Sequence, residues 1–106
     1  MPLYIVTRPF PGATKTELDA ASFRSLTCLR YHDGLGWIRS FWNPGTEILT
    51  CIYEAQDPEQ IRFHASRADI PCEEILEVQE VLPTDYMREP EPVSTHPNGN
   101  AVTDVR

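Results

Sequence analysis

The chain has 106 residues, of which 41% are hydrophobic, and its formal net charge is −7. That length and apolar fraction suit one small globular domain with a modest core. The acidic charge disfavours nucleic-acid phosphates and anionic membrane surfaces as partners, because both would be repelled. No apolar run reaches the ~18–20 residues that a membrane helix needs, and the N-terminal apolar stretch is too short for a signal peptide. We therefore expect a cytoplasmic protein.

In chain order, the first expected element is a strand over residues 3–8, which is rich in β-branched and aromatic residues and ends before the turn residues 9–12. A helix is expected over about residues 17–31, because this stretch contains no glycine or proline. Thr16 and Asp19 are spaced three residues apart, as a capping box at the start of this helix requires.

Two further strands are expected over residues 37–42 and 46–54. They should form a hairpin, because the Asn-Pro-Gly run between them is a strong turn signal. The clearest helix start in the chain follows: Asp57 caps the helix, Pro58 fits its first position, and Gln60 can complete a capping box. This helix runs to about residue 68, and a fourth strand covers residues 74–82.

The element order predicts an α+β, ferredoxin-like βαββαβ fold, with a four-stranded antiparallel sheet and two helices on one face. The other face of such a sheet must be wet or covered, and a second subunit is its usual cover. We assign residues 1–82 to this domain. Residues 83–106 hold four prolines and few large apolar groups, so we interpret them as a flexible tail or an arm that packs on a partner.

The three cysteines, Cys28, Cys51 and Cys72, are widely spaced and form no C-x-x-C pair. This spacing argues against a disulfide framework, a zinc knuckle and a thioredoxin-type motif. We expect free thiols in a reducing compartment.

Polar side chains fall on the inner faces of both expected helices. The inner stripe of the first helix mixes leucines with hydroxyl groups and an imidazole, and comprises Leu18, Ser22, Ser25, Leu29 and His32. On the second helix, His64 lies at the edge of a stripe of small and apolar residues. Such a mixture can leave a cavity beside the sheet. Each group also has an ordinary structural explanation: a hydrogen-bonded, partly buried His64, a charged helix cap at His32, and serines that bond to their own helix.

A zinc or nickel site needs several His, Cys or carboxylate groups that converge. The chain has three histidines, and one of them, His96, lies in the tail. A metal site would therefore depend on carboxylates, water or a second subunit. An imidazole with oxygen ligands suits Ni, Zn or Cu better than Ca or Mg.

The run Tyr4-Ile-Val-Thr-Arg8, with Pro-Gly at residues 11–12, resembles the opening of a family of small bacterial ferredoxin-like proteins commonly labelled nickel-binding proteins. The resemblance continues through residues 37–41, 51–55 and 57–75, and covers about residues 3–82. It implies a ferredoxin-like fold, a homodimer and nickel as the candidate cofactor. By matching position, it also implies His64, Glu54 and Cys51 as metal ligands. One departure is Thr7, where relatives often carry a glutamate.

Three functions compete. The first is a small metal-binding, homo-oligomeric protein. The second is a small-molecule enzyme of the dimeric α/β-barrel type, such as a cyclase, an isomerase or a cofactor-free monooxygenase. There His64 would act as general acid or base, and Arg39 or Tyr53 would hold an anionic oxygen. That enzyme requires a helix–sheet pocket of ~300 Å3 or more. The third is an interaction protein that binds a partner through its tail and aromatic patches.

Overall fold

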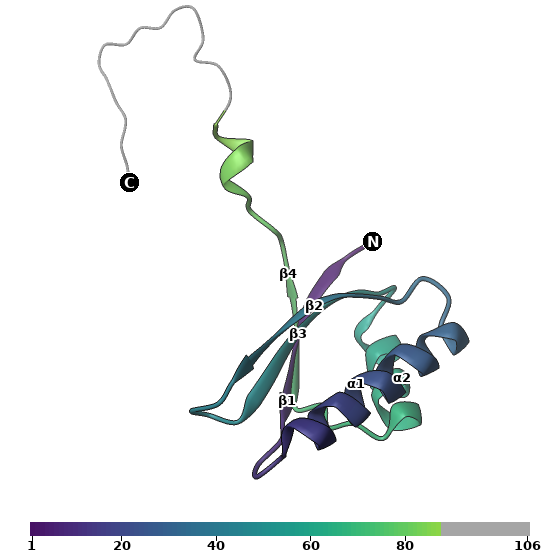
Figure 1. Ribbon diagram of the computed structural model, residues 1–106. Coiled ribbons are helices and arrows are strands. Elements are labelled where there is room, and N and C mark those ends of the chain that lie inside the picture. The colour runs from purple at the N-terminus through teal and green to yellow at the C-terminus, as the bar shows by residue number, and fades with distance from the viewer. Residues whose placement is uncertain (88–106) are drawn as a thin grey trace, which may run out of the picture.

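The computed structural model of the chain describes residues 1–87. Its elements in chain order are β1 (Leu3–Pro9), α1 (Lys15–Cys28), the 3₁₀ helix η1 (Leu29–Tyr31), β2 (Gly36–Asn43), β3 (Ile48–Glu54), α2 (Pro58–Ala68), β4 (Glu74–Val78) and the 3₁₀ helix η2 (Pro83–Asp85). The strands form one antiparallel sheet in the order β2-β3-β1-β4, and both helices cover the same face of it (Figure 1). The predicted ferredoxin-like α+β fold is confirmed.

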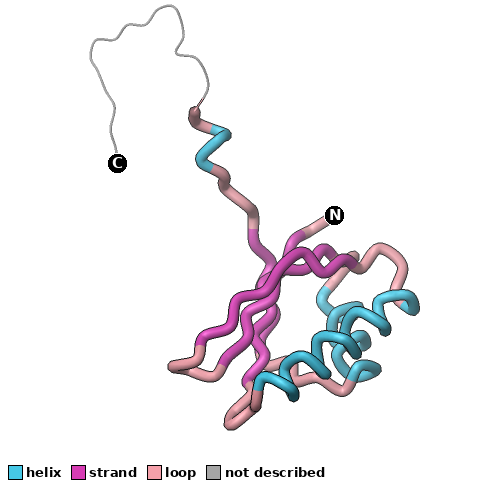
Figure 2. The backbone as a smooth tube through the Cα atoms, in the orientation of Figure 1, coloured by secondary structure: helices cyan, strands magenta, loops and turns pink. Residues whose placement is uncertain are grey.

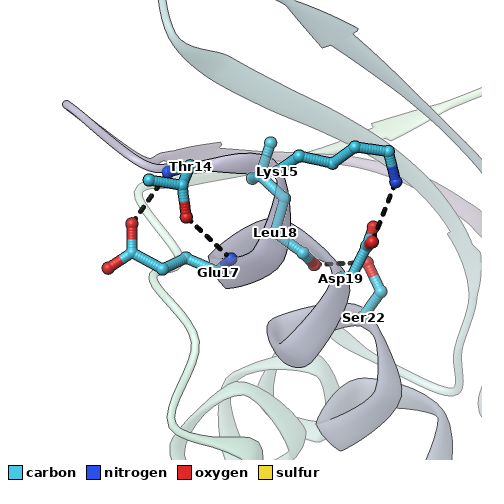
Figure 3. A network of polar contacts seen from close by, with 6 residues as sticks. All are labelled: Thr14, Lys15, Glu17, Leu18, Asp19 and Ser22. Atoms are coloured by element: carbon cyan, nitrogen blue, oxygen red, sulfur yellow. Dashed lines mark hydrogen bonds and ion pairs between the residues drawn. The ribbon is translucent and has the colours of Figure 1, made fainter.

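α1 begins at Lys15, two residues earlier than the sequence pattern predicted. Its N-cap is Thr14, whose hydroxyl accepts from the backbone N–H of Glu17 at 3.1 Å, while the Glu17 carboxylate accepts from the Thr14 N–H at 2.8 Å (Figure 3). The predicted box of Thr16 and Asp19 is therefore wrong. Asp19 instead pairs with Lys15 at 2.8 Å, one turn before it on the surface.

α2 begins as predicted, with Asp57 as N-cap and Pro58 in the first turn. The Asp57 carboxylate accepts from the backbone N–H of Gln60 at 2.9 Å. The Gln60 side chain does not complete a box with Asp57, because its oxygen accepts from the Gln56 N–H at 2.9 Å. The helix ends at Asp69, whose φ of 56° places it in the left-handed conformation.

Strand register divides the sheet into two faces. β1 and β3 pair so that Tyr4 lies opposite Tyr53 and Val6 opposite Cys51. All four are buried with Ile61 of α2 in the main core cluster, so this face meets the helices. Figure 2 shows the two layers, with the helices in cyan beside the magenta sheet. The opposite side, which we call the open face, carries apolar side chains from all four strands, namely Leu3, Ile5, Ile38, Phe41, Ile52, Leu76 and Val78.

Two strands are shorter than predicted. β4 ends at Val78 because its partner β1 begins at Leu3, the residue opposite Val78. β3 begins at Ile48 because Glu47 has a φ of 59° and its N–H donates to the Asn43 carbonyl at 2.8 Å, which closes the turn. Most of the predicted tail, residues 88–106, lies outside the described residues. No helix within residues 1–87 has the length and apolar character to cross a membrane.

Candidate functional site

His64 occupies the centre of the inner face of α2. The buried residues of this helix are Ile61, His64, Ala65 and Ala68, at the spacing of one helical face. The exposed fraction of His64 is 0%, so it is more deeply placed than the edge position expected from the sequence. Arg24 of α1 donates a hydrogen bond to the carbonyl of Ala68, the last residue of α2, at 2.9 Å, and this bond joins the two helices.

The orientation of the His64 ring is set by one hydrogen bond. Its Nε2 lies 2.8 Å from the carbonyl oxygen of Ser25 on α1. A carbonyl can only accept, so this contact assigns the proton to Nε2 and leaves a lone pair on Nδ1. Nδ1 is buried and has no hydrogen-bond partner. Burial lowers the pKa of His64, with Arg8 and His32 acting in the same direction and the Ser25 carbonyl opposing them, so the ring favours its neutral form.

A second imidazole lies against the first. The centroids of the His32 and His64 rings are 5.6 Å apart, at an interplanar angle of 89°. Nε2 of His32 is also buried without a hydrogen-bond partner. Burial, followed by the charge of Arg67, lowers the pKa of His32. His32 is the C-cap residue of η1, so the helix-end position expected from the sequence is confirmed. Its environment disfavours the imidazolium form, and the charge expected for this cap is therefore not favoured.

Tyr53 and Arg8 complete the buried polar cluster. The Tyr53 hydroxyl lies 3.0 Å from Oγ of Ser25, and its ring centroid is 5.8 Å from that of His64. The pKa of Tyr53 is raised because burial disfavours the phenolate, while Arg8 and the Ser25 hydrogen bond oppose this rise. The Cζ atom of Arg8 lies 5.4 Å from the Tyr53 ring centroid. Ser22, by contrast, bonds to its own helix as expected, donating to the Leu18 carbonyl at 2.9 Å (Figure 3).

Sequence reasoning missed Arg8, although strand alternation offered a signal. Residues 4, 6 and 8 of β1 share one face, and the first two are apolar and buried. The third position therefore carries a guanidinium into the core, where its exposed fraction is 1%.

The space between α1 and the sheet is nearly filled. A recess of about 10 Å3 is lined by Arg8, Ser25 and Tyr53, with apolar walls that include Phe10 and Trp37. This is room for about one water molecule. We call this space the Arg8 recess. It is far smaller than the ~300 Å3 that the enzyme alternative requires.

Comparison with protein-family models shows to which family the chain belongs. The chain matches the model described as nickel responsive protein SCO4226-like over residues 4–78. It belongs to the SCO4226-like family. The family resemblance inferred from the sequence is thereby confirmed.

The SCO4226-like fold is also found in a solved structure. The crystal structure of SCO4226 from Streptomyces coelicolor A3(2) matches 76% of this chain and 99% of that chain, with a TM-score of 0.67 and 20% sequence identity. At this identity the likeness concerns the fold alone. No curated protein matches the chain.

In this SCO4226-like chain, the three residues suggested as metal ligands do not converge. Cys51 is buried on the helix side of β3, with an exposed fraction of 2%, so it lies on the same side of the sheet as His64. Glu54 is exposed and lies opposite Leu3, which places it on the open face. Within residues 1–87, no group of three or more His, Cys, Asp or Glu residues has a metal-binding arrangement.

Of the residues suggested for catalysis, Tyr53 and His64 lie together and Arg39 lies apart from them. Arg39 lies on the open face, where it pairs with Glu80 at 3.5 Å. Tyr53 and His64 lie on the helix side. Arg39 therefore cannot share a substrate oxygen with His64 within one chain.

Proposed function

We propose that this protein is a homodimer that binds Ni²⁺, with His64 as the first metal ligand and His32 as the second. The description of the family as nickel responsive supports a nickel-related role. The observation that carries the proposal is the state of the His64 ring, in which Nε2 is held by the Ser25 carbonyl and Nδ1 has no partner. Metal-binding histidines almost always donate their other ring N–H in this way.

The separation of the two imidazole rings supports a shared transition-metal ion. Bonds of ~2.0–2.1 Å from a metal to each ring nitrogen, at an angle near the tetrahedral value, would hold the ring centroids roughly 5–6 Å apart. The observed separation of His32 and His64 is 5.6 Å. Both rings have a lowered pKa, so protons compete little with a metal at neutral pH.

The surroundings of the pair select the kind of metal. The charges of Arg8 and Arg67 act on these rings and oppose any cation electrostatically. Ions such as Mg²⁺ and Ca²⁺, which depend on negative oxygen ligands, are therefore disfavoured. Ni²⁺, Cu²⁺ and Zn²⁺ accept imidazole nitrogen. We assign the remaining coordination positions to water, keep Cys51 as a further candidate on the same side of the sheet, and leave Glu54 outside this site.

The open face supports the homodimer. Its members include Phe41, Leu76 and Ile38, which are exposed by 60%, 50% and 41%. A recess of about 320 Å3 lies among the apolar side chains of this face, with Arg39 and Glu80 at its rim. An apolar patch with a charged rim is typical of a protein interface, and a second copy of the sheet would cover it.

Calorimetric titration with Ni²⁺ tests the metal site. His64→Gln removes the imidazole but keeps an amide N–H that can reach the Ser25 carbonyl. We expect this variant, and His32→Ala, to lose Ni²⁺ uptake relative to the wild type. His96→Ala is the matched control and should bind like the wild type. Equal uptake by the wild type and His64→Gln would overturn the proposed site.

A further inference from the structure

The chain continues beyond the sheet as a separate segment. β4 ends at Val78, and residues 79–87, which we call the β4 arm, lead away from the two layers of the domain (Figure 1). The match to the family model ends at residue 78, so the β4 arm lies outside the matched domain. Contacts made by the β4 arm are therefore additional to those of that domain.

Short-range hydrogen bonds give the β4 arm a defined turn. It contains η2 (Pro83–Asp85), where the N–H of Asp85 donates to the Leu82 carbonyl at 3.0 Å. The Asp85 carboxylate in turn accepts from the Leu82 N–H at 3.1 Å. The N–H of Tyr86 donates to the Pro83 carbonyl at 2.9 Å. Because the turn is already formed, less conformational entropy is lost when it packs against another surface.

The β4 arm presents apolar side chains to solvent. Four of the seven residues 81–87 are large and apolar. All four are exposed, by between 44% and 75%, namely Val81, Leu82, Tyr86 and Met87. Single exposed apolar side chains are common on a protein surface, but a cluster of them marks a site of contact. The β4 arm therefore has the character of a segment that another surface covers.

The base of the β4 arm lies at the rim of the open face. Gln79 and Glu80 line the apolar recess of about 320 Å3 on that face. Glu80 also pairs with Arg39 of β2 at 3.5 Å, although β4 and β2 are opposite edges of the sheet. This ion pair holds the base of the arm on the open-face side, away from the helices. The residues that follow Glu80 therefore start beside the recess.

The length of the β4 arm suits a second copy that faces this sheet. Sheets that pack face to face lie ~10 Å apart. Tyr86 follows Glu80 by six residues, and even at the ~2 Å rise per residue of a 3₁₀ helix these residues span roughly 12 Å. Tyr86 of one copy can therefore reach the open face of the other, and twofold symmetry gives the second arm the same contact.

The sheet alone offers a modest interface. Its four strands have five to eight residues each, so the sheet covers roughly 20 Å by 20 Å at ~4.8 Å between strands and ~3.3 Å per residue. This is about 400 Å2 in projection, about half of the ~800 Å2 that each partner buries in a standard interface. Two β4 arms, each with four apolar side chains, supply further area.

We propose that the β4 arms are exchanged in the homodimer, so that the arm of each copy packs on the open face of the other and Tyr86 enters its apolar recess. An aromatic ring fits a recess of about 320 Å3 and is the kind of side chain that anchors an interface. This inference rests on the proposed homodimer. It does not depend on nickel, because the proposed metal ligands lie on the helix side of the sheet.

Sedimentation equilibrium of the full-length protein measures the dimer dissociation constant. We expect Tyr86→Ser combined with Met87→Ser to raise this constant at least tenfold, because two apolar contacts are lost. Phe23→Ser combined with Phe63→Ser is the matched control, since these side chains are also exposed but lie on the helices. The control should stay within twofold of the wild type. An arm variant that dimerises as tightly as the wild type would overturn arm exchange and leave the homodimer standing. A monomeric wild type would overturn both.

An NMR experiment on dimers mixed from isotope-labelled and unlabelled copies locates the β4 arm directly. We expect magnetisation transfer from the Tyr86 ring of one copy to isoleucine methyl groups on the open face of the other, namely those of Ile5, Ile38 and Ile52. Ile61 lies in the core and is the internal control, which should show no transfer between copies. Transfer confined to a single chain would mean that the arm covers its own open face, and arm exchange would then be wrong. It would also be wrong if Tyr86 showed no transfer to these methyl groups.

Discussion

Nε2 of His64 and the carbonyl oxygen of Ser25 lie 2.8 Å apart in the core, so that one hydrogen bond links α2 to α1. Both the stability of the fold and the proposed metal binding therefore depend on the His64 ring. It satisfies a helix carbonyl and, at the same time, fixes which ring nitrogen keeps a lone pair.

His64→Ala should therefore destabilise the fold. The substitution leaves a cavity at a position with an exposed fraction of 0% and removes the partner of the Ser25 carbonyl, which together cost about 2–4 kcal/mol. Urea unfolding measures this loss. Phe63→Ala, on the exposed side of the same helix, is the control and should change the free energy of unfolding by less than about 1 kcal/mol. A loss below that control value for His64→Ala would contradict the buried position.

Stability should fall as the pH drops from 7 towards 5.5. The pKa values of His64 and His32 are lowered from the ordinary 6.5 in the folded state. Below pH 6.5 the unfolded chain therefore binds more protons at these residues than the folded one. Their contribution to stability is complete above that pH and is lost as the pH falls through the folded pKa values.

The measurement is the free energy of unfolding at several pH values in this window, above the range in which most carboxylates titrate. His64→Gln should show a smaller slope than the wild type. An identical slope in both proteins would show that His64 does not titrate in this way.

Thr14→Ala should destabilise the protein by about 1 kcal/mol, because it removes the N-cap of α1. Thr16→Ala is the matched control, since its side chain is exposed within the first turn and caps nothing; it should have little effect. Thermal unfolding of the two variants compares them directly. A larger loss of stability for Thr16→Ala than for Thr14→Ala would instead support the capping box of Thr16 and Asp19 that the sequence pattern predicted.

Phe41→Glu should dissociate the proposed homodimer, because it places a charge on the open face. Phe63→Glu is the control, since Phe63 is 67% exposed on α2 and Phe41 is 60% exposed on β2. Light scattering during gel filtration gives the mass of each. We expect monomers for Phe41→Glu and dimers for Phe63→Glu. The reverse result would place the interface on the helices, where Phe63 lies, and would contradict an interface on the open face.

The fold could be predicted from local signals that have one strong interpretation. Asp57 followed by Pro58 strongly predicts a helix start. The Asn-Pro-Gly run strongly predicts the turn of a hairpin. The start of α1 was ambiguous because Thr14 and Thr16 each have an acidic residue three positions later. Only the structure shows that Glu17 completes the box while Asp19 pairs with Lys15.

The site was harder to predict because it depends on strand faces and register. Alternation placed Cys51 and Tyr53 together and Glu54 opposite, but it could not say which group meets the helices. The burial of Arg8 depends on contacts with residues that are distant in the sequence, and so does the contact between His32 and His64. No local pattern encodes such contacts, because they arise when the helices pack on the sheet.

The central claim is that Ni²⁺ binds between His64 and His32. Crystals of the full-length protein grown with Ni²⁺, with diffraction collected at the nickel absorption edge, test it most directly. We predict an anomalous peak within bonding distance, about 2.0–2.2 Å, of Nδ1 of His64 and Nε2 of His32. Nickel peaks found only at other residues, or no nickel peak at all, would contradict it.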